Sequence, residues 1–276
     1  MTHSVPLLTL NDGHKAPQLG YGVFQIPNDD TSRAVQEALK AGYRSIDTAA
    51  IYKNEEGVGQ GIERSGVARA GLFLTSKLWN SEQGFDSTLR AFDTSVKKLG
   101  TDYLDMYLIH WPTPKNDRYV DTWKAFIRLR EEGRIRSIGV SNFQPDHLER
   151  IVKETGVAPV VNQIELHPDF AQNDVVAANR AHQVITEAWS PLGQGGDLLK
   201  NETLVTLGKK YSKSPAQVVL RWHVQLGHMV IPKSVTPERI RSNIDVFDFE
   251  LSADDMAAIA KLDSGKRMGP NPDELN

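Results

Sequence analysis

The chain has 276 residues, of which 39% are hydrophobic and 24% are charged, so it can bury a full core. Its 32 basic and 35 acidic residues give a formal net charge of −3. The chain therefore has no overall positive potential that would attract nucleic acid or an anionic membrane. The absence of cysteine excludes disulfides, thiolate catalysis and cysteine-ligated zinc. No metal site is predicted. There is no signal-peptide pattern and no run of about 18 apolar residues, so we expect a cytoplasmic protein that does not enter a membrane.

The chain begins with the pattern of a β-hairpin, because Asn11, Asp12 and Gly13 stand between two short β-like runs. Beyond it, short apolar runs alternate with stretches of helical period. A first strand is expected at "GYGVF", and seven more at "YRSID", "LFLTSK", "DMYLIH", "IRSIGVSN", "PVVNQIE", "VITEAW" and "HMVIPKS". Helices are expected at 31–41, 85–99, 119–132, 145–155, 174–182 and 215–225.

The spacing of the strands indicates a repeating unit. Asp47, Lys77, His110 and Ser141 end successive runs at intervals of 30, 33 and 31 residues, which suits one strand, one helix and two loops. Eight such units fit the length of the chain. We therefore predict an α/β fold, a (β/α)8 TIM barrel forming a single domain over residues 1–276, with an N-terminal β-hairpin and an extra C-terminal helix.

A doubly wound parallel sheet is the competing fold. Its usual dinucleotide fingerprint, G-x-G-x-x-G, is missing from the chain. The segment "GVGQGI", which begins at Gly57, comes nearest to it but has Ile62 in place of the third glycine. The barrel is therefore the favoured prediction.

The active site of such a barrel lies at the C-terminal ends of its strands, where Asp47, Lys77 and His110 stand. Each residue alone could be a helix cap, a solvated cation or a satisfied buried histidine. Three ionisable groups at the ends of three successive apolar strands favour a site, because each would cost several kcal/mol if it were buried unpaired.

Tyr52 supplies a proton donor to this group. A free phenol titrates at about 10, and a neighbouring ammonium such as Lys77 would lower that pKa. Asp47, paired to the ammonium, would keep it charged. His110 could then hydrogen-bond a substrate oxygen and orient it. This combination is suited to a reaction in which a carbonyl oxygen gains negative charge, as in hydride transfer.

Segments in the same order along nearly the whole chain resemble those of the aldo-keto reductases: "GYRSIDTAAIYKNEEGVG", "TSKLW", "LIHWP", "IGVSNF", "VVNQIELHP" and "IPKSVTPERIRSN". Within that family the chain is most similar to bacterial 2,5-diketo-D-gluconate reductases, through "NEEGVG", "HLERIV", "NQIELHP", "PLGQG" and "NIDVFDF". The resemblance implies a monomeric (β/α)8 barrel that binds NADPH and reduces aldehydes and ketones, including dicarbonyls and keto-sugars such as 2,5-diketo-gluconate. It also implies a catalytic tetrad of Asp47, Tyr52, Lys77 and His110, with Tyr52 as general acid.

The resemblance also implies the cofactor residues. Ser141, Asn142 and Gln163 would bind the carboxamide, and Trp189 would stack on the nicotinamide, where many family members have tyrosine. The segment "SPLGQGG" would follow the pyrophosphate, since its glycines allow close backbone approach. The residues expected there are Ser190, Leu192, Gly193, Gln194 and Gly195.

The segment "KSVTPER" follows an apolar strand and precedes a helix opened by Thr236 and Pro237, where a helix N-terminus favours phosphate. In the aldo-keto reductases the corresponding segment binds the adenosine 2′-phosphate. The gluconate reductases carry arginine at the position of Thr236, so we expect a weaker phosphate clamp. The residues implied for the phosphate and the adenine are Lys233, Ser234, Val235, Arg239 and Asn243.

Phe24, Trp79 and Trp111 fall in three loops that would form the walls of the substrate pocket. Lys53 stands where the gluconate reductases have glycine, so it would either favour anionic substrates or point to solvent. Because the chain ends soon after the final helix, at "MGPNPDELN", we expect little tail over the pocket and a broad specificity.

Two other functions are compatible with a barrel of this kind. A lyase or aldolase could form a Schiff base on Lys77, but this needs a depressed lysine pKa, and a paired Asp47 argues against it. A redox-sensing module could keep the cofactor with little turnover, and the intact tetrad argues against that.

Overall fold

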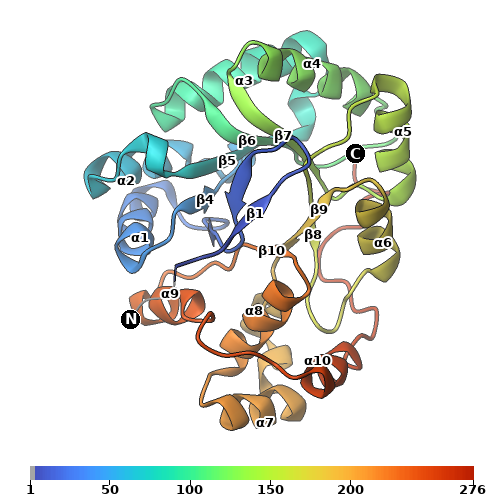
Figure 1. Ribbon diagram of the computed structural model, residues 1–276. Helices are drawn as coiled ribbons and strands as arrows, with labels where there is room; N and C mark the ends of the chain where they lie inside the picture. The colour runs from blue at the N-terminus through green and yellow to red at the C-terminus, as the bar shows by residue number, and fades with distance from the viewer. Residues whose placement is uncertain (1–3) are drawn as a thin grey trace.

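Eight parallel strands form the centre of the computed structural model, which describes residues 4–276 (Figure 1). They are hydrogen-bonded in chain order, and a parallel bridge between Leu19 and Val230 joins the last strand to the beginning of the first. The predicted (β/α)8 barrel is therefore confirmed. The strands are β3 (Tyr21–Gly22), β4 (Ser45–Asp47), β5 (Phe73–Leu78), β6 (Leu104–Ile109), β7 (Ile135–Ser141), β8 (Val161–Glu165), β9 (Ile185–Trp189) and β10 (Met229–Val230).

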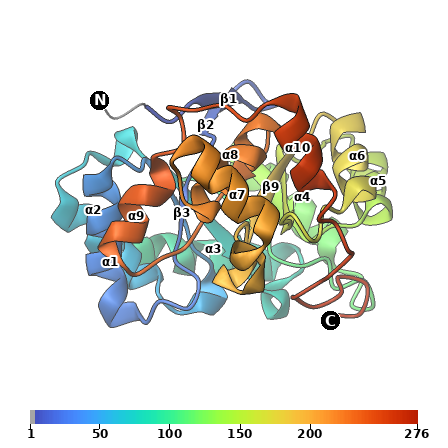
Figure 2. The same cartoon turned by 90° about the horizontal axis from the view of Figure 1, so that it is seen from below.

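Helices surround the strands, as Figures 1 and 2 show. The six helices expected from the sequence are present, with each end within three residues of the predicted position. From residue 4 onward, no helix is long and apolar enough to cross a membrane. The helices are α1 (Asn28–Ala41), α2 (Glu55–Ser65), α3 (Phe85–Leu99), α4 (Tyr119–Glu131), α5 (Pro145–Thr155), α6 (Asn173–Ala181), α7 (Glu202–Tyr211), α8 (Pro215–Gln225), α9 (Pro237–Ile244) and α10 (Ala253–Ala260).

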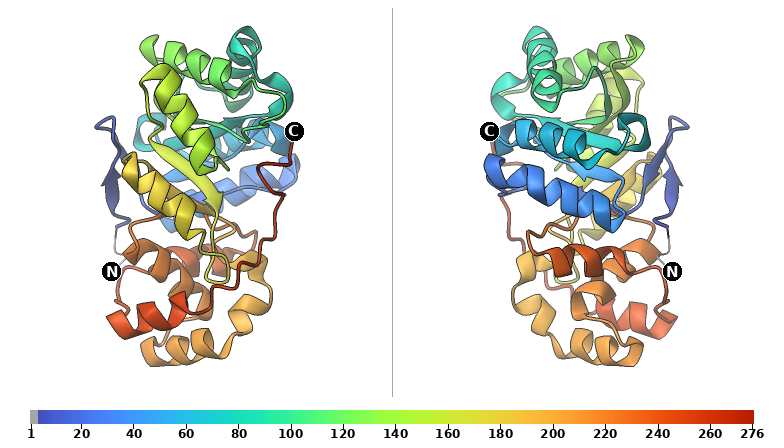
Figure 3. Two further views of the ribbon diagram at one scale, coloured as in Figure 1. Left: turned by 90° about the vertical axis from the view of Figure 1, so that its right-hand side faces the viewer. Right: turned by 90° about the vertical axis from the view of Figure 1, so that its left-hand side faces the viewer.

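The predicted N-terminal hairpin is also present. Strands β1 (Leu7–Thr9) and β2 (Lys15–Pro17) pair antiparallel, and Gly13 adopts a positive φ of 88° in the turn. Leu10 and Ala16 pack against Met106 in a small apolar cluster at the bottom of the barrel. Figure 3 shows the hairpin at one end of the barrel and the C-terminal segment at the other. The hairpin therefore leaves the carboxyl ends of the strands free for a site.

Helix α2 was not predicted, because its glycines disfavour a helix in the sequence. The structure gives them a packing role. A Cβ at Gly57 would lie 2.4 Å from the carbonyl oxygen of Asn28, and one at Gly61 would lie 2.7 Å from the Cβ of Val35. The segment that comes nearest to a dinucleotide fingerprint therefore lets α1 approach α2 closely.

Candidate active site

A buried ion pair lies at the carboxyl ends of β4 and β5. Lys77 Nζ donates to Asp47 Oδ1 at 2.5 Å and to the carbonyl oxygen of Thr48 at 3.0 Å. Burial by itself lowers the pKa of Lys77, but Asp47 and Tyr52 outweigh this effect and leave that pKa raised. Lys77 is therefore a charged ammonium at neutral pH.

Tyr52 ends a short 3-10 helix, η1 (Ala50–Tyr52), that follows β4, and its ring centre lies 5.1 Å from Lys77 Nζ. Burial raises the pKa of Tyr52, Lys77 acts to lower it, and the net pKa is raised. Lys77 therefore acts on the phenol in the expected direction, but desolvation of a phenolate has the larger effect on its pKa. Tyr52 holds its proton at neutral pH.

His110 follows β6 and lies edge-on to Tyr52, with ring centres 5.7 Å apart. Burial and the charge of Lys77 hold the pKa of His110 well below its usual range, so the imidazole is neutral. Its Nδ1 atom is buried and makes no hydrogen bond to any residue from 4 to 276. A neutral imidazole offers one N–H donor, which suits hydrogen bonding to a substrate oxygen.

The three predicted aromatic residues surround this pair of rings. Phe24 is 47% exposed and its ring centre lies 5.0 Å from that of Tyr52. Trp79 and Trp111 contact His110, with ring centres 5.2 Å and 6.5 Å away. They therefore form an aromatic wall beside the phenol and the imidazole.

Lys53 lies directly after Tyr52 but differs from it in environment. It is exposed and has a positive φ of 55°, and its side chain makes no hydrogen bond or ion pair with the described residues. Its ammonium is free to meet an anion, and the proposed role in substrate choice stays a prediction.

The four residues predicted around the nicotinamide form a hydrogen-bonded group. Ser141 Oγ donates to the carbonyl oxygen of Gln163 at 2.7 Å, and Asn142 Nδ2 donates to the carbonyl oxygen of His110 at 2.9 Å. Trp189 Nε1 donates to Asn142 Oδ1 at 2.8 Å. Asn142 therefore anchors the half-buried indole ring next to the histidine.

Glu187 in β9 belongs to the same group but was not predicted. Gln163 Nε2 donates both to Asp47 Oδ2 at 3.0 Å and to Glu187 Oε2 at 2.8 Å. The signal in the sequence was a carboxylate inside the apolar run "VITEAW". The same kind of signal had identified Asp47.

The loop that follows β9 has several left-handed residues. Positive φ values occur at Ser190 (48°), Gly193 (55°), Gln194 (55°) and Gly195 (72°). The N–H groups of Gly193 and Gly195 donate to carbonyl oxygens within the loop, so its role at the pyrophosphate stays a prediction. Leu192 is half-buried beneath this loop, whereas Gln194 and Gly195 are exposed.

The segment from the end of β10 into the first turn of α9 presents two cations. Lys233 and Arg239 are exposed, and neither forms an ion pair within the structurally described chain. Ser234 Oγ accepts from the N–H of Thr236 at 3.1 Å, which shapes the start of α9. Val235 is 57% exposed and Asn243 is buried in α9. Cations at a helix start favour phosphate oxygens, and the role of this segment at the 2′-phosphate stays a prediction.

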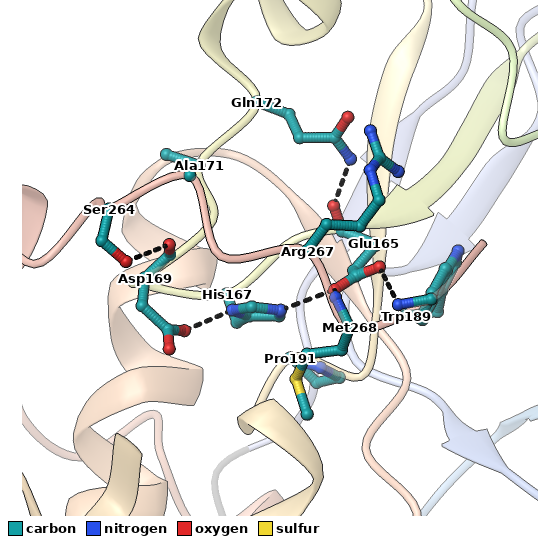
Figure 4. A network of polar contacts seen from close by, with 12 residues as sticks. Glu165, His167, Asp169, Ala171, Gln172, Trp189, Pro191, Ser264, Arg267 and Met268 are labelled. Carbon is teal, nitrogen blue, oxygen red and sulfur yellow. Dashed lines mark hydrogen bonds and ion pairs between the residues drawn. The ribbon is translucent and has the colours of Figure 1, made fainter. Parts of the chain in front are cut away.

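The C-terminal tail, residues 261–276, does cross the carboxyl ends of the strands. The Glu165 carboxylate at the end of β8 accepts the N–H of Met268 at 2.6 Å and that of Gly269 at 2.8 Å (Figure 4). A Cβ at Gly269 would lie only 2.5 Å from the Trp189 ring. The expectation of little tail over the site is therefore wrong, because a buried carboxylate ties the tail against this indole.

Two further contacts hold the tail in place. His167 bridges the carboxylates of Glu165, at 3.0 Å, and Asp169 (Figure 4). The Asp169 carbonyl oxygen accepts the N–H of Lys266 at 3.1 Å. At the end of the chain, Asn276 Oδ1 accepts the N–H of Lys115 at 2.8 Å. The tail thus reaches from α10 to the loop after β6.

The chain is similar to known proteins over nearly its whole length. A family model described as "Aldo/keto reductase family" matches residues 16–264. The chain is 54% identical to methylglyoxal reductase DkgA of Yersinia pestis over 269 residues, which cover 97% of this chain and 96% of that protein. It is 61% identical to an aldo/keto reductase crystal structure from Brucella melitensis, with a TM-score of 0.92 and coverage of 94% and 100%. A mutant of Gox0644 in complex with NADPH is 52% identical, with a TM-score of 0.95 and coverage of 99% and 100%.

Proposed function

The chain belongs to the aldo/keto reductase family, and we propose that it reduces small aldehydes, ketones and dicarbonyls to alcohols with NADPH. Methylglyoxal is the first substrate to test, because a relative of 54% identity is named a methylglyoxal reductase. Keto-sugars such as 2,5-diketo-gluconate are the second class, on the resemblance in the sequence. The aromatic wall formed by Phe24, Trp79 and Trp111 supports small carbonyl substrates.

The observation that carries this proposal is a phenol beside a buried lysine that pairs with a carboxylate. When bound, NADPH supplies the hydride. Tyr52 donates its proton to the carbonyl oxygen, and Lys77 stabilises the phenolate that remains. Asp47 holds Lys77 charged, at 2.5 Å. Neutral His110 donates a hydrogen bond that orients the carbonyl.

The charged state of Lys77 also argues against Schiff-base chemistry. A lysine that attacks a carbonyl must be a free amine, which needs a depressed pKa. Asp47 and Tyr52 instead raise the pKa of Lys77. Covalent trapping with borohydride should therefore leave the protein unmodified.

For the cofactor, Gln163, Ser141 and Asn142 would hold the carboxamide, and Trp189 would stack on the ring. The glycine-rich loop after β9 would lie along the pyrophosphate, and Lys233 and Arg239 would meet the 2′-phosphate. The unpaired state of these two cations supports NADPH over NADH as the preferred cofactor.

The test is a turnover assay on the purified chain. NADPH absorbance is followed with methylglyoxal, a simple aldehyde, a ketone and 2,5-diketo-gluconate, and the alcohols are identified by mass spectrometry. We expect consumption of NADPH matched by alcohol formation with the aldehyde and the dicarbonyl. NADPH binding with no turnover on any reactive aldehyde would instead favour the sensing module.

A further inference from the structure

Glu187 is a buried carboxylate that no step of the proposed reaction uses. It is 2% exposed and lies in β9, in register with Gln163 of β8. The neighbouring strand β10 places Met229 in register on its other side. A carboxylate in such a position needs a hydrogen-bond donor, and the donor is the side-chain amide of Gln163.

That amide has only one favourable orientation. Its nitrogen carries two N–H donors, and they meet Asp47 Oδ2 at 3.0 Å and Glu187 Oε2 at 2.8 Å. A flipped amide would point its carbonyl oxygen at the carboxylate of Asp47 and, when Glu187 is ionised, at a second carboxylate, and these repel it. With the nitrogen held between two acids, Gln163 Oε1 is turned away from both.

We infer that Glu187 is a positioning residue for the cofactor: together with Asp47 it locks the Gln163 amide so that Oε1 accepts a hydrogen bond from the carboxamide of the nicotinamide. This inference rests on the proposed function. It assigns two carboxylates to the site, one that pairs with the ammonium and one that orients the amide. A single amide then links the proton-donating residues to the nicotinamide pocket.

The charges around Glu187 give this role a measurable signature. The charged groups that face it are Asp47 from β4 and Lys77 from β5, and Lys77 already pairs with Asp47. Burial and Asp47 raise the pKa of Glu187 to about 7. A second negative charge therefore develops beside this pair as the pH rises from 6 to 8. That charge favours the positively charged ring of NADP⁺ over the neutral ring of NADPH.

The experiment compares the full-length parent with Glu187→Met and Glu187→Gln. Dissociation constants for NADPH and NADP⁺ are measured by fluorescence titration at pH 6 and pH 8. Met removes the acceptor, so NADPH binding should weaken about 2- to 12-fold, the range expected for one neutral hydrogen bond. Gln keeps a carbonyl acceptor without the charge, so it should bind NADPH about as the parent does.

The pH signature distinguishes orientation from mere packing. In the parent, the preference for NADP⁺ over NADPH should rise several-fold from pH 6 to pH 8, and in Glu187→Gln it should stay flat. The ratio of the two constants cancels the titration of the shared 2′-phosphate. Glu55→Gln is the control, since Glu55 is an equally buried acid that accepts instead from Ser76 Oγ at 2.6 Å. It should behave as the parent does.

Parent-like constants at both pH values in Met and Gln variants would overturn the role of Glu187. If the Met variant does not fold, the pH dependence of the Gln variant decides alone. Failure of the proposed reduction is a separate result, because it is read from turnover of the parent with methylglyoxal and not from these titrations.

Discussion

Tyr52 is the residue on which the proposed chemistry depends most directly, since it is the proton donor beside Lys77. Tyr52→Phe removes the hydroxyl and keeps the ring that packs on Phe24. General acid catalysis contributes about 10² to 10⁴ in rate, so kcat with methylglyoxal should fall by that factor while NADPH affinity holds. Stopped-flow reduction and a binding titration measure the two quantities. A variant with half of the parent rate would remove Tyr52 from the role of acid.

The pH profile of reduction follows from the raised pKa of Tyr52. A raised phenol pKa means that the proton is present through neutral pH and is lost only as the pH rises through that pKa. In Glu187→Gln, which removes the carboxyl that titrates at about 7, we therefore expect a kcat that is flat across neutral pH and falls on the alkaline side. Because the pKa of His110 is far below its usual range, protonation of His110 should not reduce kcat near pH 6. A loss of rate between pH 7 and pH 6 in this variant would contradict the neutral imidazole.

Helix α9 carries the proposed preference for NADPH, and it provides its own control. Arg239 is unpaired, whereas Arg241 of the same helix donates to Glu238 at 3.2 Å. A charge-assisted hydrogen bond contributes about 1.5 to 3 kcal/mol, so Arg239→Ala should weaken NADPH by about 10- to 150-fold and leave NADH nearly unchanged. Arg241→Ala should change neither constant. Equal weakening of both cofactors by Arg239→Ala, at constant ionic strength, would show that this side chain does not contact the 2′-phosphate.

Helix α2 allows a prediction in which a Gly→Ala substitution lowers the stability of the protein instead of raising it. Alanine in place of glycine normally stabilises a helix by about 1 kcal/mol. At Gly61 the new Cβ would lie 2.7 Å from the Cβ of Val35 and 2.8 Å from the carbonyl oxygen of Ser32, so Gly61→Ala should destabilise the protein, by about 1 to 3 kcal/mol. Gly71→Ala is the control, because nothing lies within 4 Å of its Cβ. Urea unfolding of both variants measures the difference, and a stabilised Gly61→Ala would refute the close packing of α1 on α2.

The elements also show what the sequence can predict. Asp47, Lys77 and His110 were found because each ends an apolar run at regular spacing, and the barrel brings such ends together. The bond between Gln163 and Glu187 depends on the register of β8 against β9, which no local pattern contains. Helix α2 was missed for a similar reason, since its glycines make sense only against the helices that touch them.

At the scale of the whole molecule, the tail joins the end of the chain to the barrel through Glu165. Burial acts to raise the pKa of the Glu165 carboxyl. The hydrogen bonds from His167, Gly269 and Met268 together have a larger effect in the opposite direction, so the pKa is lowered overall. A lowered pKa in the folded state stabilises the protein above the unfolded pKa of about 4.3, and this contribution is lost as the pH falls through the folded value. Glu165→Gln should therefore destabilise the protein at pH 7 and less so in acid. Chemical unfolding at both pH values tests this, and a constant difference would contradict it.

The tail also bears on the cofactor site, because Gly269 fits against the ring proposed to stack on the nicotinamide. A Cβ at this position would lie 2.5 Å from Trp189 and 3.0 Å from Glu165 Oε2, so Gly269→Ala must displace either the tail or the indole. We expect NADPH binding to weaken several-fold, and trypsin to cleave faster after Lys266, which is exposed in the tail. Gly71→Ala, whose Cβ meets nothing within 4 Å, should match the parent in both assays. Unchanged cleavage together with unchanged NADPH affinity in Gly269→Ala would mean that the tail packs on Trp189 without constraining it. Faster cleavage with unchanged affinity would mean that the tail can leave while Asn142 alone keeps the indole in place, through its bond of 2.8 Å to Trp189 Nε1.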